Sequence, residues 1–304
     1  MEVQLDLFRD NPRVIRKNDA AILLRDADVA GALKIYDTLL EEQPDDEELA
    51  DRRQAVAPWL EALATFRAAP AGRERLYELW SGLTRSTPPP LASGLRRLLV
   101  AELERLPAPE RIYIPPRFHI GAILLEEGRY AEAERWLAPA LETGIADRAR
   151  FLAWRGRALA ALGSWEAGRH CYRDAFLLDP RCAAGELPWP PELEELIASL
   201  EGECGDELDG APLEAWLPAW GWLQGCFALP APERPPEQAA AFWDEKETSG
   251  SIPPPRLWFE YLRIAEHLRR DSPDHAALVA IRRKMKQLND PMFRRYLAKI
   301  VQAP

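Results

Sequence analysis

The residues able to carry catalysis or bind a metal ion are few in this 304-residue chain, and they are widely spaced. The four cysteines stand 11, 22 and 22 positions apart: Cys171, Cys182, Cys204 and Cys226. The four histidines form no His-Glu-x-x-His motif and no close pair. Zinc and redox sites need such clusters. We therefore expect no metal site and, in a reducing compartment, no disulfide framework.

Sequence motifs of nucleotide-binding and hydrolytic enzymes are also absent. The chain contains no GxGxxG, GxxxxGK[ST] or GxSxG segment, so nothing in it predicts a phosphate-binding loop or an activated serine. The acidic run Asp45–Glu48 has the composition to hold a divalent cation. Carboxylates at a solvated helix start are the commoner arrangement. We expect a non-enzymatic protein without a cofactor.

The composition predicts a folded protein with a sizeable core. Hydrophobic residues make up 47% of the chain, which argues against wholesale disorder. No apolar run approaches the roughly 20 residues needed to cross a bilayer. The first residues include Glu2 and Asp6 and no cleavable apolar core, so no secretory signal is expected. We expect a cytoplasmic protein that does not contact membranes.

Charge is distributed unevenly along the chain. The net charge of −10 argues against a general nucleic-acid binder. Residues 256–304 reverse the balance, with 11 Lys and Arg against 5 Asp and Glu. A basic segment in this region contains Arg282, Arg283, Lys284 and Lys286. It is either the solvated face of an amphipathic helix or a patch for nucleic acid or an acidic partner, so any nucleic-acid contact is expected to be indirect or weak.

An aromatic concentration precedes this basic region. Trp216, Trp220, Trp222 and Phe227 lie close together in the sequence. Their near-helical spacing favours a place in the core, and large aromatics carry much of a core's apolar area. A peptide-binding groove is the alternative, because aromatic residues are enriched at binding hot spots.

The chain repeats itself at a helical spacing. Residues 121–141 align with residues 156–176 after a shift of 35 positions. The matched pairs are Gly121 with Gly156, Gly128 with Gly163, Tyr130 with Trp165 and Ala140 with Ala175, and Ala133 falls on Gly168. Small residues let two helices cross closely, and a glycine suits the turn after the first helix. A weaker copy, at 13–46, has Val29, Ala32, Tyr36 and Pro44 at the spacing of Trp165, Gly168, Tyr172 and Pro180.

These residues resemble the tetratricopeptide repeat (TPR), a helix–turn–helix unit of about 34 residues. The resemblance is good over 114–183 and fair over 13–46. It departs from the family at Arg155, where an apolar residue is usual, and the first unit lacks the closing proline. The resemblance implies a curved stack of helix pairs. We therefore expect an all-α chain, an α-solenoid of TPR-like helix–turn–helix repeats with additional C-terminal helices.

Proline clusters at 86–90, 187–191, 230–237 and 251–255 punctuate the remaining helices. Proline ends one helix and suits the first turn of the next. Apolar stripes predict helices from Leu91 and from Leu257. We expect four segments: a tail at 1–11, N-terminal helical repeats at 12–110, a TPR-like pair at 111–185, and a C-terminal helical region with a basic tail at 186–304.

The pentapeptide Gln-Leu-Asp-Leu-Phe stands at Gln4–Phe8. Asn11-Pro12 predicts a helix start directly after it, because asparagine caps free amides and proline suits the first helical position. The pentapeptide is therefore expected in an N-terminal tail, where apolar side chains mark a binding site. The alternative is a hydrophobic staple that folds Leu7 or Phe8 back onto the first helix, near Ile15 or the neighbouring turn at Ala21.

This pentapeptide resembles the motif by which bacterial proteins dock on the replicative sliding clamp, the β subunit of DNA polymerase III. The family pattern is Gln, Leu, Ser or Asp, Leu, Phe, and the match holds at every position. The resemblance implies that Gln4 is the polar anchor, Leu5 fills a shallow subsite and Asp6 stays near solvent. Leu7 and Phe8 would enter a deep apolar pocket of the clamp.

Taken together, these features predict an adaptor. The motif supplies the sliding clamp as one partner, and the helical repeats supply a surface for a second protein or peptide. The alternative is a general TPR scaffold with no role in replication or repair. An enzyme, or an accessory to one, gains no support from the motif search.

Overall fold

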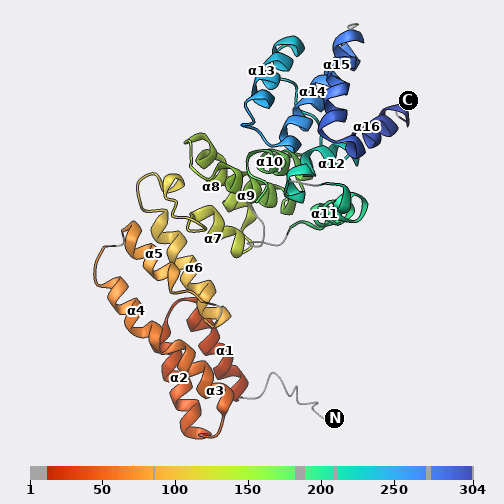
Figure 1. The fold of residues 1–304 in the computed structure, drawn as a ribbon. Coiled ribbons are helices and arrows are strands. Elements are labelled where there is room, and N and C mark those ends of the chain that lie inside the picture. The colour runs from red at the N-terminus through yellow and green to blue at the C-terminus, as the bar shows by residue number, and fades with distance from the viewer. Residues whose placement is uncertain are drawn as a thin grey trace. The chain divides into compact units, whose positions relative to one another are not determined.

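The computed structural model describes residues 12–70, 72–84, 86–181, 189–208, 211–271 and 275–302. Within these ranges helices follow one another through turns and short coils (Figure 1). The extended pairing in the described part of the chain is one isolated bridge between Ile114 and Phe118. The expectation of an all-α chain is therefore confirmed.

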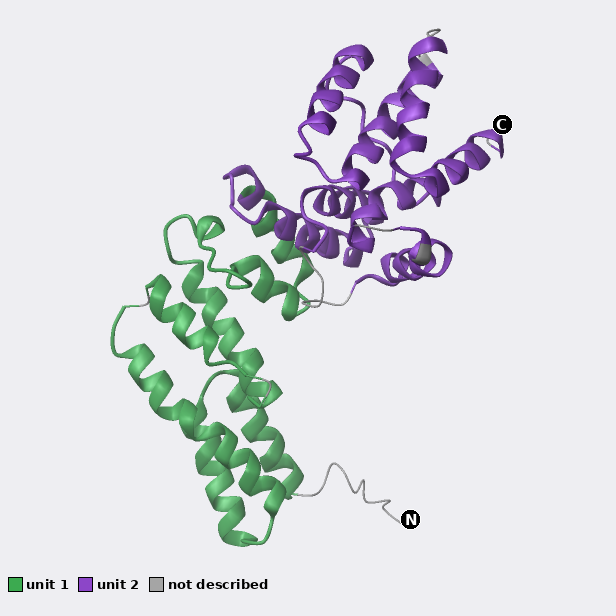
Figure 2. Cartoon of the chain, viewed as in Figure 1, with its two compact units in different colours: residues 1–139 green, residues 140–304 purple. Residues whose placement is uncertain are grey.

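The chain divides into two compact units, residues 1–139 and residues 140–304 (Figure 2). The boundary falls inside α8, and so inside the predicted TPR-like pair at 111–185. Unit 1 contains α1 (Pro12–Arg25), α2 (Val29–Glu42), α3 (Glu47–Val56), α4 (Pro58–Arg67), α5 (Arg73–Ser81), α6 (Pro89–Leu103), the 3-10 turn η1 (Pro109–Arg111), α7 (Ile120–Glu126) and most of α8 (Tyr130–Glu142). The expected division into four segments stays a prediction.

Unit 2 is built from the remaining helices. In chain order these are α9 (Arg148–Ala161), α10 (Trp165–Leu178), α11 (Pro191–Cys204), the 3-10 turns η2 (Gly205–Glu207) and η3 (Leu213–Trp216), α12 (Leu217–Leu223), α13 (Pro236–Thr248), α14 (Pro254–Asp271), α15 (His275–Leu288) and α16 (Asp290–Gln302). The prediction that proline clusters start helices is confirmed, since α6, α11, α13 and α14 each begin at a proline.

Unit 1 is organised around the pair α1–α2, on which α6 packs. The crossing of α1 and α6 is close at Gly94, where an added Cβ would lie 2.3 Å from the carbonyl oxygen of Leu24. Arg97 of α6 donates to the carbonyl of Arg25, and Arg67 donates to that of Ala27. These arginines bind one carbonyl at the end of α1 and one in the turn that follows it.

The turns that connect the two helices in three pairs, α1–α2, α7–α8 and α9–α10, have the same conformation. Ala27, Gly128 and Gly163 occupy equivalent repeat positions, and their φ angles are +55°, +70° and +76°. In each turn the following residue donates its N–H to the carbonyl five positions back, at 2.8–2.9 Å. This is the hydrogen bond that closes a helix with a left-handed residue. The glycine turns follow the prediction, whereas Ala27 was not foreseen because its type gives no signal of a positive φ.

The pair α9–α10 confirms that small residues mark a close helix crossing. An added Cβ at Gly168 would lie 2.9 Å from the carbonyl oxygen of Gly156, and one at Gly156 would lie 3.1 Å from that of Gly168. Tyr172 and Ala175 are buried on the same helix. Only glycine allows the two backbones to approach this closely.

Tryptophan side chains form much of the core of unit 2. Trp216 and Trp258 pack edge to face, with ring centres 6.2 Å apart. Trp220 donates its indole N–H to Ser199 at 2.8 Å, which fixes α12 against α11. Trp216, Trp220, Trp222 and Phe227 are all buried. The expectation that this aromatic concentration belongs to the core is therefore confirmed.

Candidate partner-binding sites

The pentapeptide Gln4–Phe8 lies outside the described residues, as does Asn11. The structure does describe the helix that follows. Helix α1 begins at Pro12 as predicted, and Arg13 and Lys17 in its first turns pair with Asp46. The Asp46 carboxylate also accepts the N–H of Leu49 and so caps α3. This hydrogen bond lowers the pKa of Asp46. The predicted helix start at the acidic run is thus confirmed.

The basic segment of α15 is partly committed to internal contacts. Lys284 pairs with Asp244 and, at 3.4 Å, with Glu247 on α13. The Tyr261 hydroxyl donates to the same two carboxylates at 2.9 Å. Lys284 also lies 5.4 Å from the centre of the Tyr261 ring. This network joins α13, α14 and α15, and it is a stabilising contact within unit 2.

Arg282 is committed in a similar way. Its guanidinium donates to the Tyr296 hydroxyl at 3.2–3.3 Å, and Tyr296 donates to buried Glu266 at 3.1 Å. Burial raises the pKa of Tyr296 to about 12. Of the four predicted patch residues, Arg283 and Lys286 are the exposed ones, and Lys286 lies 3.9 Å from Asp290. Two of the four cations are therefore half-buried and engaged within unit 2 and two are exposed, and the patch stays a prediction.

Unit 1 contains a groove of about 740 Å³ lined by residues of α3, α4 and α5 and of the coil that follows. Its apolar lining includes Trp59, Phe66 and Leu79, whose side chains are largely buried beneath it. Glu61 on α4 and Glu78 on α5 line it as exposed carboxylates. Concave, mostly apolar sites with a few polar groups are typical of binding pockets.

Arg75 connects the two sides of this groove. Its guanidinium donates to the carbonyl of Thr65 at 2.5 Å and lies 5.9 Å from the centre of the Phe66 ring. Arg75 thereby adds a second donor to a carbonyl in the last turn of α4, which also accepts the N–H of Ala68 at 3.3 Å. The Thr65 carbonyl and the Phe66 ring carry no net charge, so Arg75 keeps its full positive charge while part of its set of N–H donors is engaged.

A second cavity, of about 250 Å³, lies in unit 2 between α13, α14 and the coil before α13. Glu260 is 2% exposed and stands between Arg256, at 2.9 Å, and Arg263, at 2.6 Å. Burial raises the pKa of Glu260, and the two guanidiniums oppose that shift. Removing one member of such a buried triad would leave an uncompensated charge.

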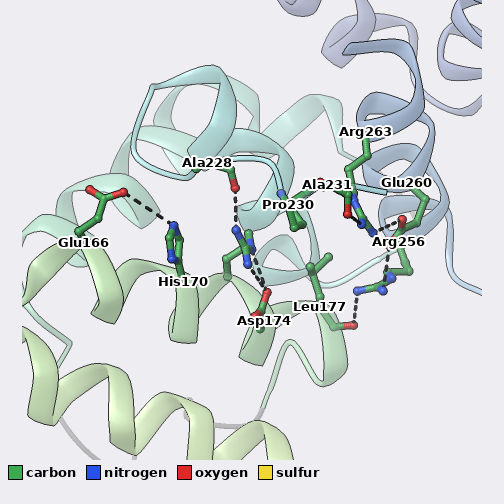
Figure 3. Close-up of polar contacts among 11 residues, drawn as sticks. Glu166, His170, Asp174, Leu177, Ala228, Pro230, Ala231, Arg256, Glu260 and Arg263 are labelled. Carbon is green, nitrogen blue, oxygen red and sulfur yellow. Dashed lines mark hydrogen bonds and ion pairs between the residues drawn. The ribbon is translucent and has the colours of Figure 1, made fainter. Parts of the chain in front are cut away.

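The arginines of this cluster hold neighbouring segments to α14 and α10 (Figure 3). Arg263 donates to the carbonyls of Pro230 and Ala231 at 3.2 and 2.5 Å, and Arg256 donates to that of Leu177 at 3.3 Å. Arg173 donates to that of Ala228 at 2.7 Å. The coil at 228–231 is thus held by arginine donors, and we interpret the cluster as structural.

Three further observations concern metal-ligating groups, a histidine–glutamate pair and membrane spans. Within the described ranges, no group of three or more His, Cys, Asp and Glu side chains is placed to hold a metal ion. His170 lies 3.7 Å from Glu166 on the surface of α10 (Figure 3). Across the same described residues, no helix has the length and apolar character to span a membrane.

Comparisons with protein-family models, with curated proteins and with solved structures found no match to this chain. The sequence and the geometry therefore carry the functional argument alone.

Sequence reasoning missed the groove of unit 1. The groove is formed by α3, α4 and α5, which lie outside the well-matched repeats and carry no repeat signal. A usable signal was present in α4, where Trp59, Leu63 and Phe66 share one helical face while Glu61 points elsewhere. That signal predicts an amphipathic helix, but it does not say which part of the face stays open.

Proposed function

We propose that this protein is a non-enzymatic adaptor that docks on the bacterial replicative sliding clamp and holds a second protein on its helical surface. The observation that carries the proposal is the match of Gln4–Phe8 to the clamp-binding pattern at all five positions. The motif ends three residues before α1, whose first turns are fixed to α3 through Asp46. A partner bound at the motif would therefore be tethered close to unit 1.

The energetics of the proposed docking are those of a short linear motif. Burying each of Leu7 and Phe8 would contribute about 1.5–3 kcal/mol before ordering costs. Such a motif alone binds weakly, and a second contact raises the apparent affinity through effective concentration. In the proposed adaptor, the helical surface makes this second contact by binding another protein.

The proposed scaffold is a stack of TPR-like helix pairs. Three observations support it: the sequence spacing, the shared turn at Ala27, Gly128 and Gly163, and the close crossing of α9 and α10. These features also fit the alternative, a general TPR scaffold without a role in replication or repair. The motif favours the adaptor, because a scaffold that binds only through its helices has no use for it.

The proposal is tested by replacing Leu7 and Phe8 with alanine in the full chain. We expect the double variant to lose measurable binding to purified bacterial clamp, with an unchanged circular dichroism spectrum. The matched control is Asp6→Ser, which keeps the clamp-binding pattern and should keep the affinity. Unchanged clamp binding by the double variant would refute the docking proposal.

The alternative makes a different prediction for the proteins recovered from cells. A general scaffold would recover one specific partner outside replication, in amounts that Leu7→Ala and Phe8→Ala leave unchanged, and the clamp would be missing. The adaptor would recover the clamp with the unaltered chain and lose it with the double variant. Quantitative mass spectrometry of both pull-downs separates the two functions.

A further inference from the structure

We propose that the groove between α4 and α5 binds a cationic amphipathic helix of a partner protein. The inference rests on the proposed adaptor function and names the chemistry of its second partner. The groove, its charges and its apolar lining all lie within unit 1.

The size and lining of the groove suit a helix. About 740 Å³ of space is lined by three helices and the coil after α5, which is ample for the apolar side chains along one helix face. Trp59, Phe66 and Leu79 offer the apolar contacts. Amphipathic helices bind grooves of this kind through anchors spaced three or four residues apart. Small residues on the rim, including Ala62 and Gly82, leave room for a backbone to approach.

The charge of the groove selects among such helices. Three arginines of α3–α5 are paired with carboxylates: Arg52 with Glu48, Arg53 with Asp37, and Arg73 with Glu74. Arg67 and Arg75 donate to the carbonyls of Ala27 and Thr65 and keep their positive charge. No ion pair or hydrogen bond is found for the carboxylates of Glu61 and Glu78 among the described residues, although both line the groove. Among the described residues that line the groove, these two carboxylates stand against one cation, Arg75, so the lining carries a net charge of −1 beside an apolar floor.

A helix that complements this surface carries Lys or Arg flanking an apolar face. Opposite charges across an interface speed the encounter and fix the orientation of the partner. The chain's own N-terminal segment fits poorly, because residues 1–11 contain Glu2, Asp6 and Asp10 against the single cation Arg9. Charge thus favours an external cationic partner over this segment.

The experiment uses a fluorescein-labelled peptide of about 16 residues, long enough for roughly four helical turns. Its leucines occupy one helical face and its lysines the other, and a matched peptide carries glutamate in place of lysine. We expect the full chain to bind the lysine peptide in anisotropy titrations at 0.15 M salt and to show no measurable binding of the glutamate peptide. Equal binding of the two peptides would overturn the charge argument.

Variants locate the binding site. The double variant Glu61→Gln and Glu78→Gln should weaken binding about 5-fold or more, as expected for two exposed ion pairs. Ala62→Trp, which fills the groove from the exposed face of α4, should weaken it at least as much. The control Asp19→Asn with Glu41→Gln removes two exposed carboxylates on α1 and α2 and should change nothing. Equal effects of the control and groove variants would refute the proposal.

Two other occupants are outcomes of the same test. Displacement of the lysine peptide by the peptide MEVQLDLFRDNP would assign the groove to the chain's own N-terminal segment and overturn the proposal. Self-association in analytical ultracentrifugation that Ala62→Trp abolishes would assign it to a second copy, with the same consequence. The groove variants should keep clamp binding, and Leu7→Ala with Phe8→Ala should keep peptide binding. Failure of one proposal is therefore distinguishable from failure of the other.

Discussion

At the scale of single residues, a side chain's role follows from what it contacts rather than from its type. The type of His119 would suit an acid or base, but both of its ring nitrogens contact backbone groups of the protein. Nδ1 accepts the N–H of Gly121 at 3.0 Å and so caps α7, and Nε2 lies 3.2 Å from the carbonyl oxygen of Glu110. The residue is fully buried, and burial lowers the pKa of His119 to about 4.

We expect this histidine to make unit 1 sensitive to acid. The unfolded chain takes up a proton at His119 as the pH falls below about 6.5, whereas the folded chain resists protonation until about 4. The free energy of unfolding therefore decreases across this window, by about 1.4 kcal/mol per pH unit at most. Urea unfolding at several pH values measures the slope. His119→Asn, which retains a capping oxygen but does not titrate, should reduce it, and an equal slope in both proteins would contradict this account.

Lys284 and Arg283 make a matched pair for a second prediction. Lys284 joins α15 to Asp244 and Glu247, whereas Arg283 is exposed. Lys284→Ala should lower the free energy of unfolding by about 1–2 kcal/mol, because it leaves two carboxylates without their cation. Arg283→Ala should stay within about 0.5 kcal/mol. Thermal unfolding of the two variants compares them, and equal stabilities would show that the network contributes nothing.

At the scale of the helices, small residues allow the backbones of two helices to approach each other closely. In α9–α10 the backbones of Gly156 and Gly168 come within a distance that excludes a side chain. In α1–α6 the same is true at Gly94. These glycines lie inside helices, where glycine is intrinsically unfavourable. Packing therefore outweighs helix propensity at these positions.

Gly168→Ala should destabilise unit 2 by about 2 kcal/mol or more, because its Cβ would press on the Gly156 carbonyl. The control is Gly202→Ala in α11, where an added Cβ meets nothing within 4 Å. That substitution should stabilise the protein by about 0.5–1 kcal/mol through helix propensity. Chemical denaturation measures both changes. A neutral Gly168→Ala would mean that the crossing relaxes without cost.

The sequence predicts features whose causes are local and misses those that arise from tertiary packing. Proline starts, capping carboxylates and glycine turns depend on a few neighbouring residues, so α1, α6 and the turn at Gly163 were predictable. The partners of Lys284 lie about 40 positions away, and the groove depends on how three helices diverge. Neither can be read from periodicity, because periodicity identifies the face of a helix but not what covers it.

At the scale of the whole chain, the number of cations in a segment differs from the number that are available to bind a partner. Residues 256–304 hold 11 cations, yet several of these contact acceptors within unit 2: Arg256, Arg263, Arg269, Arg282, Lys284, Arg295 and Lys299. Much of the basic C-terminal region therefore stabilises the packing of its own helices. A high local count of cations is a poor guide to nucleic-acid binding when carboxylates and carbonyls lie beside it.

We accordingly expect only weak binding to duplex DNA. Electrophoretic mobility shifts at about 0.15 M salt should give dissociation constants no tighter than those of non-specific binding, roughly 10⁻⁴–10⁻⁶ M. Arg283→Ala with Lys286→Ala, which removes the exposed cations of the basic segment, should abolish what remains. Nanomolar binding that survives this double variant would show that the principal DNA contact lies elsewhere.

The central claim is that Gln4–Phe8 is a docking motif for the sliding clamp. Its most direct measurement is a titration of labelled MEVQLDLFRDNP, and then of the whole protein, against purified bacterial clamp with and without DNA. We predict saturable binding of the peptide at about micromolar concentration, equivalent to about 8 kcal/mol, and binding of the whole protein at least as tight. A clamp that binds neither the peptide nor the protein at any concentration tested would contradict the account.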